Sequence, residues 1–158
     1  MKARAKDIMC ANPQCCTPDI SIQEAARMMD NCDCGAIPVI VDGDKKKAIG
    51  VITDRDIALR AVAVGKGPQA TVRECMSSPL AVIGEDSSVA ECCEAMERSK
   101  VRRLMVVDSD GELCGIIAQA DVARHLSKTM IAEVVKEVSE PTEEPSLVRT
   151  APNTMSSR

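Results

Sequence analysis

Polar side chains at three places in this 158-residue sequence could bind a small molecule. A hydroxyl and a carboxylate lie three residues apart in Thr53-Asp54-Arg55-Asp56, and Asp121 lies in a related segment further along the chain. A carboxylate can accept hydrogen bonds from two neighbouring hydroxyl groups of a sugar, and a threonine that begins a helix lies beside free backbone N–H groups, where a phosphate is favoured. Arg102 and Arg103 could hold phosphate oxygens in bidentate hydrogen bonds. These residue types therefore allow a phosphorylated ligand.

Each of these groups also has a purely structural explanation. A threonine N-cap with an acidic residue three positions later is a capping box, which stabilises a helix by about 1 kcal/mol. Asp121, however, is present where Ala118 has no hydroxyl to form such a cap, and this favours a ligand role. Arg102 and Arg103 could simply form a solvated charged edge. The sequence leaves both explanations open.

The nine cysteines are the other reactive side chains. Their number is odd, so they cannot all pair within one chain, and none has the paired C-x-x-C spacing typical of a zinc site. Cys92 and Cys93 lie on the apolar face of an expected helix and are expected to be buried small hydrophobic residues. Cys32 and Cys34 are expected near a helix end, where a redox or metal role is an alternative. His125, the sole histidine, is expected at the surface because no nucleophile motif accompanies it.

The composition argues against several classes of protein. With 45% hydrophobic residues, 28% charged residues and a net charge of -4, the chain has the balance of a globular protein. No apolar run approaches the roughly 18 residues that a membrane span requires. No secretory signal is recognisable at the N-terminus, so we expect a cytoplasmic protein with reduced thiols. The acidic balance and the complete absence of Phe, Trp and Tyr argue against nucleic-acid binding.

The sequence contains two copies of one unit. Gly50–Ile57 recurs as Gly115–Val122, an offset of 65 residues. Positions upstream, such as Ser21 and Ser88, are related by an offset of 67 because the first hairpin is longer. Each copy is too small to bury much apolar surface alone, so the two are expected to share a core.

Each copy has the periodicity of a strand, a helix, two strands and a second helix. Ser21 and Ser88 each precede an apolar stripe at helical spacing and have a glutamate three residues later, which is a capping box. Val- and Ile-rich runs around Asp42-Gly43-Asp44 and Asp108-Ser109-Asp110-Gly111 predict β-hairpins. In the first copy the second helix is expected to end at Gly65. The expected fold is α/β of the α+β type, with the order β-α-β-β-α in each copy.

The end of the chain is expected to extend the last helix and then to lose structure. Met130, Ile131, Val134, Val135 and Val138 recur at helical spacing and suit packing or a dimer surface. The polar run that follows is typical of disorder. The expected organisation is repeat 1 (1–65), a linker (66–73), repeat 2 (74–128), a helical extension (129–138) and a disordered tail (139–158).

The two copies resemble a tandem pair of CBS domains, a unit also called a Bateman module. The resemblance covers about residues 3–128 and rests on Gly50–Asp56 with its counterpart in repeat 2, on Cys34–Val39 and on Val101–Leu104. The chain is most similar to small stand-alone bacterial or archaeal proteins without a catalytic domain. The resemblance implies a short sheet with two helices on one face in each repeat, pseudo-twofold packing of the repeats, and adenosine compounds bound in clefts between them.

The resemblance also implies which residues bind such a ligand. Asp56 and Asp121 would hold ribose hydroxyls, and Thr53 would contact ribose or phosphate. Ala118 stands where the family has a hydroxyl residue in repeat 2. The other implied contacts are Arg102 and Arg103, which match phosphate-binding positions in energy-sensing kinase γ subunits, the backbone of Ala36, Ile37, Leu104 and Met105 at the adenine, and Pro38 and Cys16 as apolar walls.

We therefore expect a regulatory homodimer that binds an adenine nucleotide or adenosyl compound (AMP, ADP, ATP or S-adenosylmethionine) and signals to a protein partner. No other cofactor, no metal, no nucleic acid and no membrane partner are expected. The absence of Walker, Gly-x-Ser-x-Gly, His-Glu-x-x-His and Gly-x-Gly-x-x-Gly motifs argues against catalysis. The alternatives are a cysteine-based redox or metal sensor and a purely structural dimerisation module.

Overall fold

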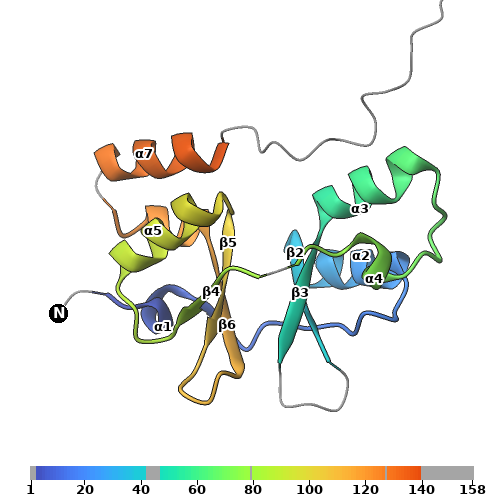
Figure 1. Ribbon diagram of the computed structural model, residues 1–158, viewed down its shortest axis with the longest axis horizontal. Coiled ribbons are helices and arrows are strands. Elements are labelled where there is room, and N and C mark those ends of the chain that lie inside the picture. Colours follow the sequence, from blue (N-terminus) through green and yellow to red (C-terminus); the bar gives the residue numbers. More distant parts are fainter. Residues whose placement is uncertain (1–2, 42–46, 79, 127, 140–158) are drawn as a thin grey trace, which may run out of the picture.

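The computed structural model describes residues 3–41, 47–78, 80–126 and 128–139. Figure 1 shows its elements, coloured along the chain. In chain order they are α1 (Ala5–Ile8), β1 (Cys10–Ala11), α2 (Ile22–Asn31), β2 (Ala36–Ile40), β3 (Ala48–Thr53), α3 (Asp54–Arg60), the 3-10 turn η1 (Val62–Val64), α4 (Val72–Cys75), β4 (Val82–Gly84), α5 (Val89–Ser99), β5 (Arg103–Val107), β6 (Leu113–Ala118), α6 (Gln119–Ala123) and α7 (Lys128–Ser139).

The mixed α+β fold and the repeated order of elements are confirmed. Repeat 2 contains β4, α5, β5, β6 and α6 in the expected sequence. Repeat 1 contains α2, β2, β3 and α3, but its first strand is reduced to a single parallel bridge between Cys16 and Val39. The second predicted turn is present, with Gly111 at a φ of 79°. The first, at 42–44, lies outside the described residues.

Two sheets lie at the centre of the molecule. β2 and β3 form an antiparallel pair, and the second sheet has the strand order β1-β6-β5-β4, with β4 parallel to β5. In Figure 1 the helices lie on the outer sides of the two sheets, whose other faces turn toward each other.

Each sheet packs against its helices through one apolar face, which gives two separate cores; the expectation of one core shared by the two copies is wrong. Ile22, Ala25 and Met29 of α2 are buried in the core of repeat 1, as the helical spacing predicts. The Oγ of Ser21 accepts a hydrogen bond from the backbone N–H of Glu24 at 3.1 Å. A serine cap begins α5 in the same way, with the backbone N–H of residue 91 donating at 3.2 Å. The predicted helix starts are therefore confirmed.

The segment in front of each repeat packs on the other repeat. Ala5 and Ile8 of α1 are buried in the core of repeat 2, and Val72 and Cys75 of α4 are buried in the core of repeat 1. In the same way, β1 extends the sheet of repeat 2 by pairing with β6. The helix that precedes repeat 1 in the sequence, α1, therefore completes the core of repeat 2. The helix that precedes repeat 2, α4, completes the core of repeat 1.

At each place where one of these leading segments packs on the sheet of the other repeat, a methionine side chain covers a glycine of a strand. A Cβ atom on Gly50 would lie 2.9 Å from the Sδ of Met76 and 3.0 Å from the backbone oxygen of Ser77. A Cβ atom on Gly115 would overlap the side chain of Met9. Glycine is therefore required in both strands to let the incoming segment approach the sheet.

The chain has two helices at its end where the sequence predicts one. α6 ends at Ala123, and the N–H of His125 turns back to the carbonyl oxygen of Val122 at 2.9 Å. The turn lets α7 return across α5, so that Val138 is buried in the core of repeat 2 while Val135 is 44% exposed. The predicted stripe positions 130, 131 and 134 and the tail from residue 140 lie outside the described side chains.

Candidate functional site

Thr53 and Asp56 form the capping box that their spacing predicts. Thr53 ends β3 and caps α3, and its Oγ accepts a hydrogen bond from the backbone N–H of Asp56 at 3.1 Å. In return, the Oδ2 of Asp56 accepts hydrogen bonds from the N–H of Thr53 at 3.0 Å and from its hydroxyl at 2.8 Å. The structural explanation of this pair is therefore correct, whatever else the pair does.

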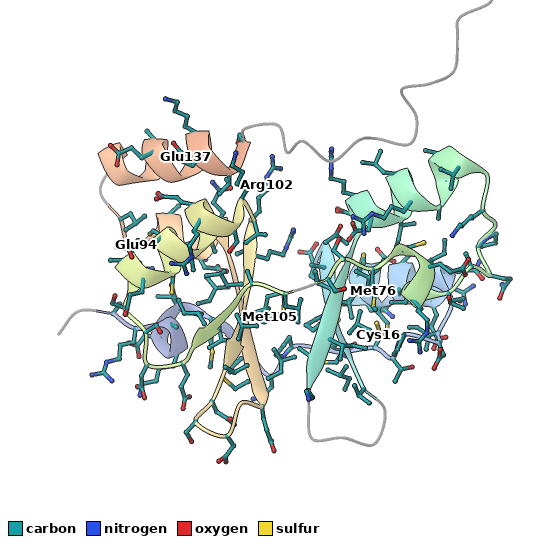
Figure 2. The ribbon with its side chains drawn as sticks, in the orientation of Figure 1. Cys16, Met76, Glu94, Arg102, Met105 and Glu137 are labelled. Carbon is teal, nitrogen blue, oxygen red and sulfur yellow. The ribbon has the colours of Figure 1, made fainter. Side chains whose placement is uncertain are left out.

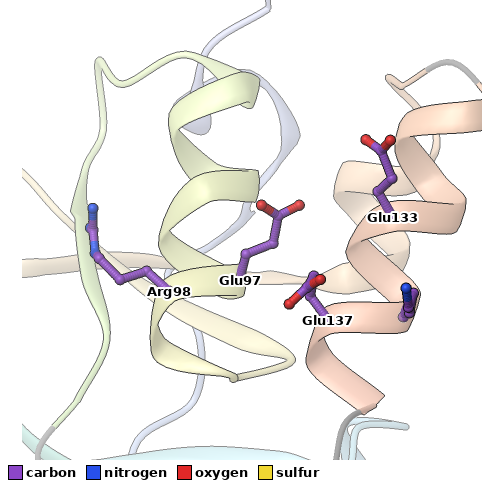
Figure 3. A pocket seen from close by; sticks show the side chains of 5 residues that line it. Glu97, Arg98, Glu133 and Glu137 are labelled. Atoms are coloured by element: carbon purple, nitrogen blue, oxygen red, sulfur yellow. The ribbon is translucent and has the colours of Figure 1, made fainter.

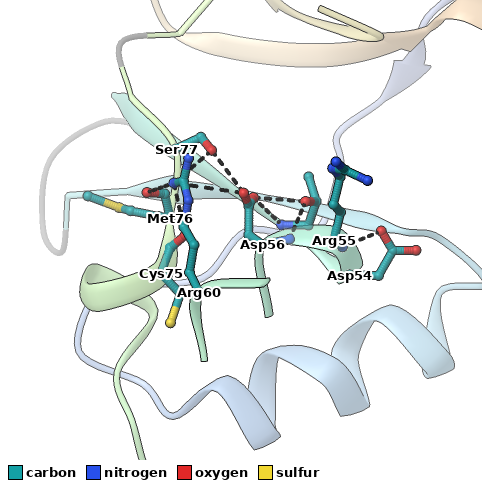
Figure 4. Close-up of polar contacts among 8 residues, drawn as sticks. Asp54, Arg55, Asp56, Arg60, Cys75, Met76 and Ser77 are labelled. Carbon is teal, nitrogen blue, oxygen red and sulfur yellow. Dashed lines mark hydrogen bonds and ion pairs between the residues drawn. The ribbon is translucent and has the colours of Figure 1, made fainter. Parts of the chain in front are cut away.

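The other oxygen of Asp56 ties α3 to the segment after α4. The Oδ1 accepts a hydrogen bond from the hydroxyl of Ser77 at 3.0 Å, and the guanidinium of Arg60 lies 3.8 Å away. The same guanidinium donates to the hydroxyl of Ser77 at 3.1 Å and to the carbonyl oxygen of Met76 at 3.0 Å. Figure 4 shows this network. It leaves the side chain of Asp56 only 12% exposed.

Sequence reasoning missed two members of this network. Arg60 lies four residues after Asp56 on α3, a spacing that brings side chains together on a helix and could have indicated the pair. Ser77 lies 21 residues away, so no local pattern connects it to Asp56.

Asp121 has fewer partners than Asp56. Its Oδ2 accepts a hydrogen bond from the backbone N–H of Ala118 at 2.8 Å, and its Oδ1 lies 3.4 Å from the guanidinium of Arg124. Ala118 begins α6 as expected but offers no hydroxyl. The side chain of Asp121 is 25% exposed and that of Arg124 is 74% exposed.

Arg103 reaches from repeat 2 to repeat 1. A Cβ atom on Gly35 would lie 3.3 Å from the Nη2 of Arg103 and 2.9 Å from the Oδ2 of Asp54. The guanidinium therefore lies against the loop before β2, beside the first residue of α3. Arg102 is exposed, and its carbonyl oxygen accepts a hydrogen bond from the N–H of Gln119 at 2.9 Å.

The predicted apolar residues fall on two different faces. Ile37 and Leu104 are buried in the two helix-side cores, so only their backbones could border a ligand between the repeats. Side chains alternate along a strand, which places Ala36, Pro38 and Met105 on the opposite faces, where all three are buried. Met105 is labelled in Figure 2.

Cys16 does not reach that inner face with its side chain. Its thiol lies in the core of repeat 1, and this burial raises the pKa of Cys16 to about 12. Its backbone runs beside β2, with its N–H donating to the carbonyl oxygen of Pro38 at 3.0 Å. Only the main chain of Cys16 could therefore border a ligand between the repeats.

A pocket of about 590 Å³ lies elsewhere, between α5 and α7. Figure 3 shows that charged side chains line it, and none of them is a predicted ligand residue. The lining residues are Glu97, Arg98, Glu133, Lys136 and Glu137.

The exposed cysteines do not form a metal centre in the described part of the chain, where no group of three or more His, Cys, Asp or Glu side chains could hold an ion. The thiol of Cys34 donates a hydrogen bond to the carbonyl oxygen of Ala36 at 3.5 Å. Partial burial and the neighbouring sulfur raise the pKa of Cys32. Within the same described ranges, no helix combines the length and hydropathy of a membrane span.

The CBS-domain family model matches the sequence twice, over residues 5–62 and 72–128. The chain belongs to the CBS-domain family. It is 36% identical over 138 residues to Hypoxic response protein 1 of Mycobacterium tuberculosis, covering 87% of this chain and 94% of that protein. It is 40% identical over 118 residues to the CBS domain-containing protein YhcV of Bacillus subtilis, covering 75% and 81% of the two chains.

Solved structures of CBS-domain proteins share the fold. A structure of Hypoxic Response Protein I with two coordinated zinc ions has 35% identity and a TM-score of 0.69, covering 79% of this chain and 100% of that one. CBSX2 in complex with AMP has 26% identity and a TM-score of 0.63, covering 77% and 93%. The CBS domain pair of protein MJ0100, in complex with 5'-methylthioadenosine and S-adenosyl-L-methionine, has 27% identity and a TM-score of 0.69, covering 78% and 95%.

Proposed function

We propose that this protein is a cytoplasmic, non-catalytic regulatory module that binds an adenine nucleotide or adenosyl compound between its two CBS repeats. The observation that carries the proposal is Arg103, whose guanidinium crosses from repeat 2 to lie beside the start of α3 in repeat 1. A cation at that place, beside the start of the helix that Thr53 caps, suits a ligand that spans both repeats. The complexes of CBSX2 with AMP and of MJ0100 with adenosyl compounds support this ligand class.

The remaining predicted residues have matching roles in the proposed site. Asp56 and Asp121 accept hydrogen bonds from ribose hydroxyls, and Arg102 assists Arg103 at the phosphate. Ala36, Pro38 and Met105, which are buried on the inner faces of the sheets, form the apolar walls between which the adenine inserts. A ligand held by both repeats favours one arrangement of them, and this differential affinity changes the surface offered to a protein partner.

Thermal unfolding with a panel of ligands tests the proposal. The chain has no Trp, Tyr or Phe, so unfolding is followed by far-ultraviolet circular dichroism of the reduced protein. A ligand at about a hundred times its Kd stabilises by roughly 2.7 kcal/mol, which raises the midpoint by about 5–10 °C. We expect this shift with at least one of AMP, ADP, ATP and S-adenosylmethionine at millimolar concentration, and none with GTP. Equal midpoints with all of them would contradict the proposal.

Arg103→Ala tests the phosphate contact. We expect the affinity for AMP to fall about tenfold, since a charge-assisted hydrogen bond contributes about 1.5–3 kcal/mol, while the affinity for adenosine stays unchanged. Isothermal titration calorimetry measures both. The control is Arg98→Ala, an arginine that lines the outer pocket. If adenosine and AMP lose affinity equally, Arg103 has no specific role at the phosphate.

We also propose that the protein forms a homodimer through α3 and η1. No residue of α3 is buried, and Leu59, Val62 and Val64 are 46%, 68% and 45% exposed. Sedimentation velocity of Val62→Asp is expected to show monomer where the wild type sediments as a dimer. Val82→Asp, at a similarly exposed valine on β4, serves as the control. A monomeric wild type would refute the assembly.

A thiol-based redox sensor is the second candidate, favoured by the position of Cys34 beside Cys32, where it contributes to the raised pKa of Cys32. Hydrogen peroxide would join two thiols in a disulfide and be reduced to two molecules of water, so that the protein loses two hydrogen atoms. Intact mass spectrometry after peroxide treatment detects this loss, and Cys32→Ser is expected to abolish it. An unchanged mass removes the redox candidate, and native mass spectra without a bound ion remove a metal-sensing one.

A further inference from the structure

Cys10 lies on the face of its sheet that turns toward repeat 1. It pairs with Ile116 of β6, which in turn pairs with Met105 of β5. Residues directly opposite each other on adjacent strands share one face of the sheet, so Cys10 lies on the inner face with Met105. Arg103, two positions before Met105 on β5, shares this face, and its guanidinium lies against Gly35 of repeat 1. Cys10 therefore belongs to the surface from which the sheet of repeat 2 meets the loop before β2.

Two more thiols lie on that loop. Cys32 follows the last residue of α2, and Cys34 precedes Gly35. Partial burial raises the pKa of Cys32, and the sulfur atoms of Cys34 and then Cys10 raise it further. Repulsion between charged groups in water is largely screened beyond about 10 Å, so the three sulfur atoms lie in one neighbourhood. Strand pairing and the loop thus bring together thiols from both halves of the molecule.

The orientation of these three thiols favours one pair. The thiol of Cys34 donates to the carbonyl oxygen of Ala36 at 3.5 Å, which directs it toward its own strand. Cys32 instead lies within the electrostatic influence of Cys10, which is exposed. Redox-sensitive cysteines are typically exposed and lie next to a second thiol that completes the disulfide. Cys10 and Cys32 fit these two roles.

We propose that Cys10 and Cys32 form a disulfide under oxidising conditions and that this bond regulates the ligand site between the repeats. Hydrogen peroxide oxidises the thiolate of Cys10 to a sulfenic acid and leaves as hydroxide, which takes up a proton to become water. The thiol of Cys32 then displaces the sulfenic hydroxyl group as a second water, so one peroxide and two thiols give one disulfide. The inference deepens the redox candidate, and it rests on the proposed function for the ligand.

The disulfide would fasten the two sheets in the arrangement that the structure shows. Ala36, Pro38 and Met105 are buried on the inner faces, which turn toward each other, so an adenine enters between them only if the sheets move apart. A bond from β1 to the loop before β2 opposes this movement. When the binding-competent arrangement is depleted, the apparent Kd rises in proportion. Oxidation is therefore expected to weaken ligand binding.

Peptide mapping identifies the bonded pair. Trypsin separates residues 7–27, which contain Cys10, from residues 28–45, which contain Cys32 and Cys34. After peroxide treatment without reductant, we expect these two peptides to be joined and the intact protein to keep the mass of a single chain. Cys10→Ser is expected to abolish the loss of two hydrogen atoms, and Cys34→Ser, the matched control, to retain it. A loss that Cys10→Ser retains and Cys34→Ser abolishes, or a peroxide-linked dimer, would overturn the inference.

Calorimetry tests the effect on the ligand. We expect oxidised wild type to bind AMP at least tenfold more weakly than reduced wild type, a reductant to restore the affinity, and Cys10→Ser to bind equally in both conditions. An AMP affinity that oxidation leaves unchanged would overturn the regulatory half.

A readout without ligand separates this inference from the proposed function. A cross-link restricts the unfolded chain, so peroxide is expected to raise the unfolding midpoint of the wild type by several degrees and to leave that of Cys10→Ser unchanged. If AMP, ADP, ATP and S-adenosylmethionine all fail to bind the reduced protein, the proposed function is refuted, and the midpoints and the peptide map still decide whether the disulfide forms. A wild-type mass that peroxide leaves unchanged would refute the redox candidate and this inference together.

Discussion

At the scale of single residues, burial sets the chemistry of most cysteines. Removal from water raises the pKa of Cys16 to about 12 and that of Cys92 to about 11. Because the thiolate is the nucleophile, the raised pKa makes Cys16 much less reactive than an exposed cysteine at about pH 8. We expect iodoacetamide to modify the exposed Cys10 and Cys34 first, which timed alkylation and peptide mass spectrometry would show. Modification of Cys16 as fast as Cys34 would contradict its burial.

The same two thiols make stability depend on pH in the alkaline range. Their pKa values are raised in the folded state, so the folded protein keeps protons that the unfolded chain releases above about pH 8.5. Their contribution is fully present below that pH and is lost as the pH rises toward about 11 for Cys92 and 12 for Cys16. The unfolding midpoint is therefore expected to fall between about pH 9 and 11. The unfolding midpoint of Cys16→Ala should fall less steeply with pH than that of the wild type. The midpoint of Cys10→Ala should have the same pH dependence as that of the wild type.

Residue types and spacing predicted part of the candidate site. The spacing of Thr53 and Asp56 is enough to place a capped helix start, because all of its bonds are local. The partner of the second carboxylate oxygen, Ser77, comes from a segment whose position depends on how α4 packs. Spacing along the chain carries no information about that contact.

At the scale of elements, the close approach of α4 to β3 predicts a strong effect of one methyl group. Gly50→Ala places a Cβ atom 3.0 Å from the backbone oxygen of Ser77, which cannot move like a flexible side chain. Overpacking of this kind costs about 1–3 kcal/mol. Gly84→Ala is the control, since the nearest atom to its Cβ would be the Oγ of Ser87 at 3.7 Å. The free energies of unfolding of the two variants, measured with urea, are expected to differ by that amount. Equal free energies would refute the contact.

Periodicity predicted the elements better than their partners. The stripes on α2 and α5 identify the buried faces, and the serine caps identify where both helices begin. Neither signal says which sheet a four-residue helix such as α1 covers, because its two apolar positions fit either core. The separate α7 was missed for a related reason: its spacing fits a continuation of α6, and spacing does not reveal the turn after Ala123 that brings Val138 into the core of repeat 2.

At the scale of the whole molecule, α1 packs in the core of repeat 2 and α4 packs in the core of repeat 1. This arrangement predicts that neither repeat folds without the other. A cut after Gly67, in an exposed loop, leaves α1 on the first fragment and α4 on the second. Each fragment then lacks a helix that its own core requires. We expect both to be largely unfolded alone and to form a folded one-to-one complex when mixed, as measured by circular dichroism and sedimentation. Cooperative unfolding of either fragment by itself would contradict this.

The packing of each leading helix on the other repeat also has a consequence for how such a chain could arise. A gene that encoded one copy would yield a polypeptide whose leading helix has no place on its own sheet. Two such polypeptides could satisfy each other by exchanging those helices, so the precursor would have existed as a domain-swapped pair. Duplication and fusion of the gene would then have turned an exchange between molecules into one within a single chain. After fusion each copy occurs once per molecule, and the residues around Asp56 and Asp121 became free to diverge.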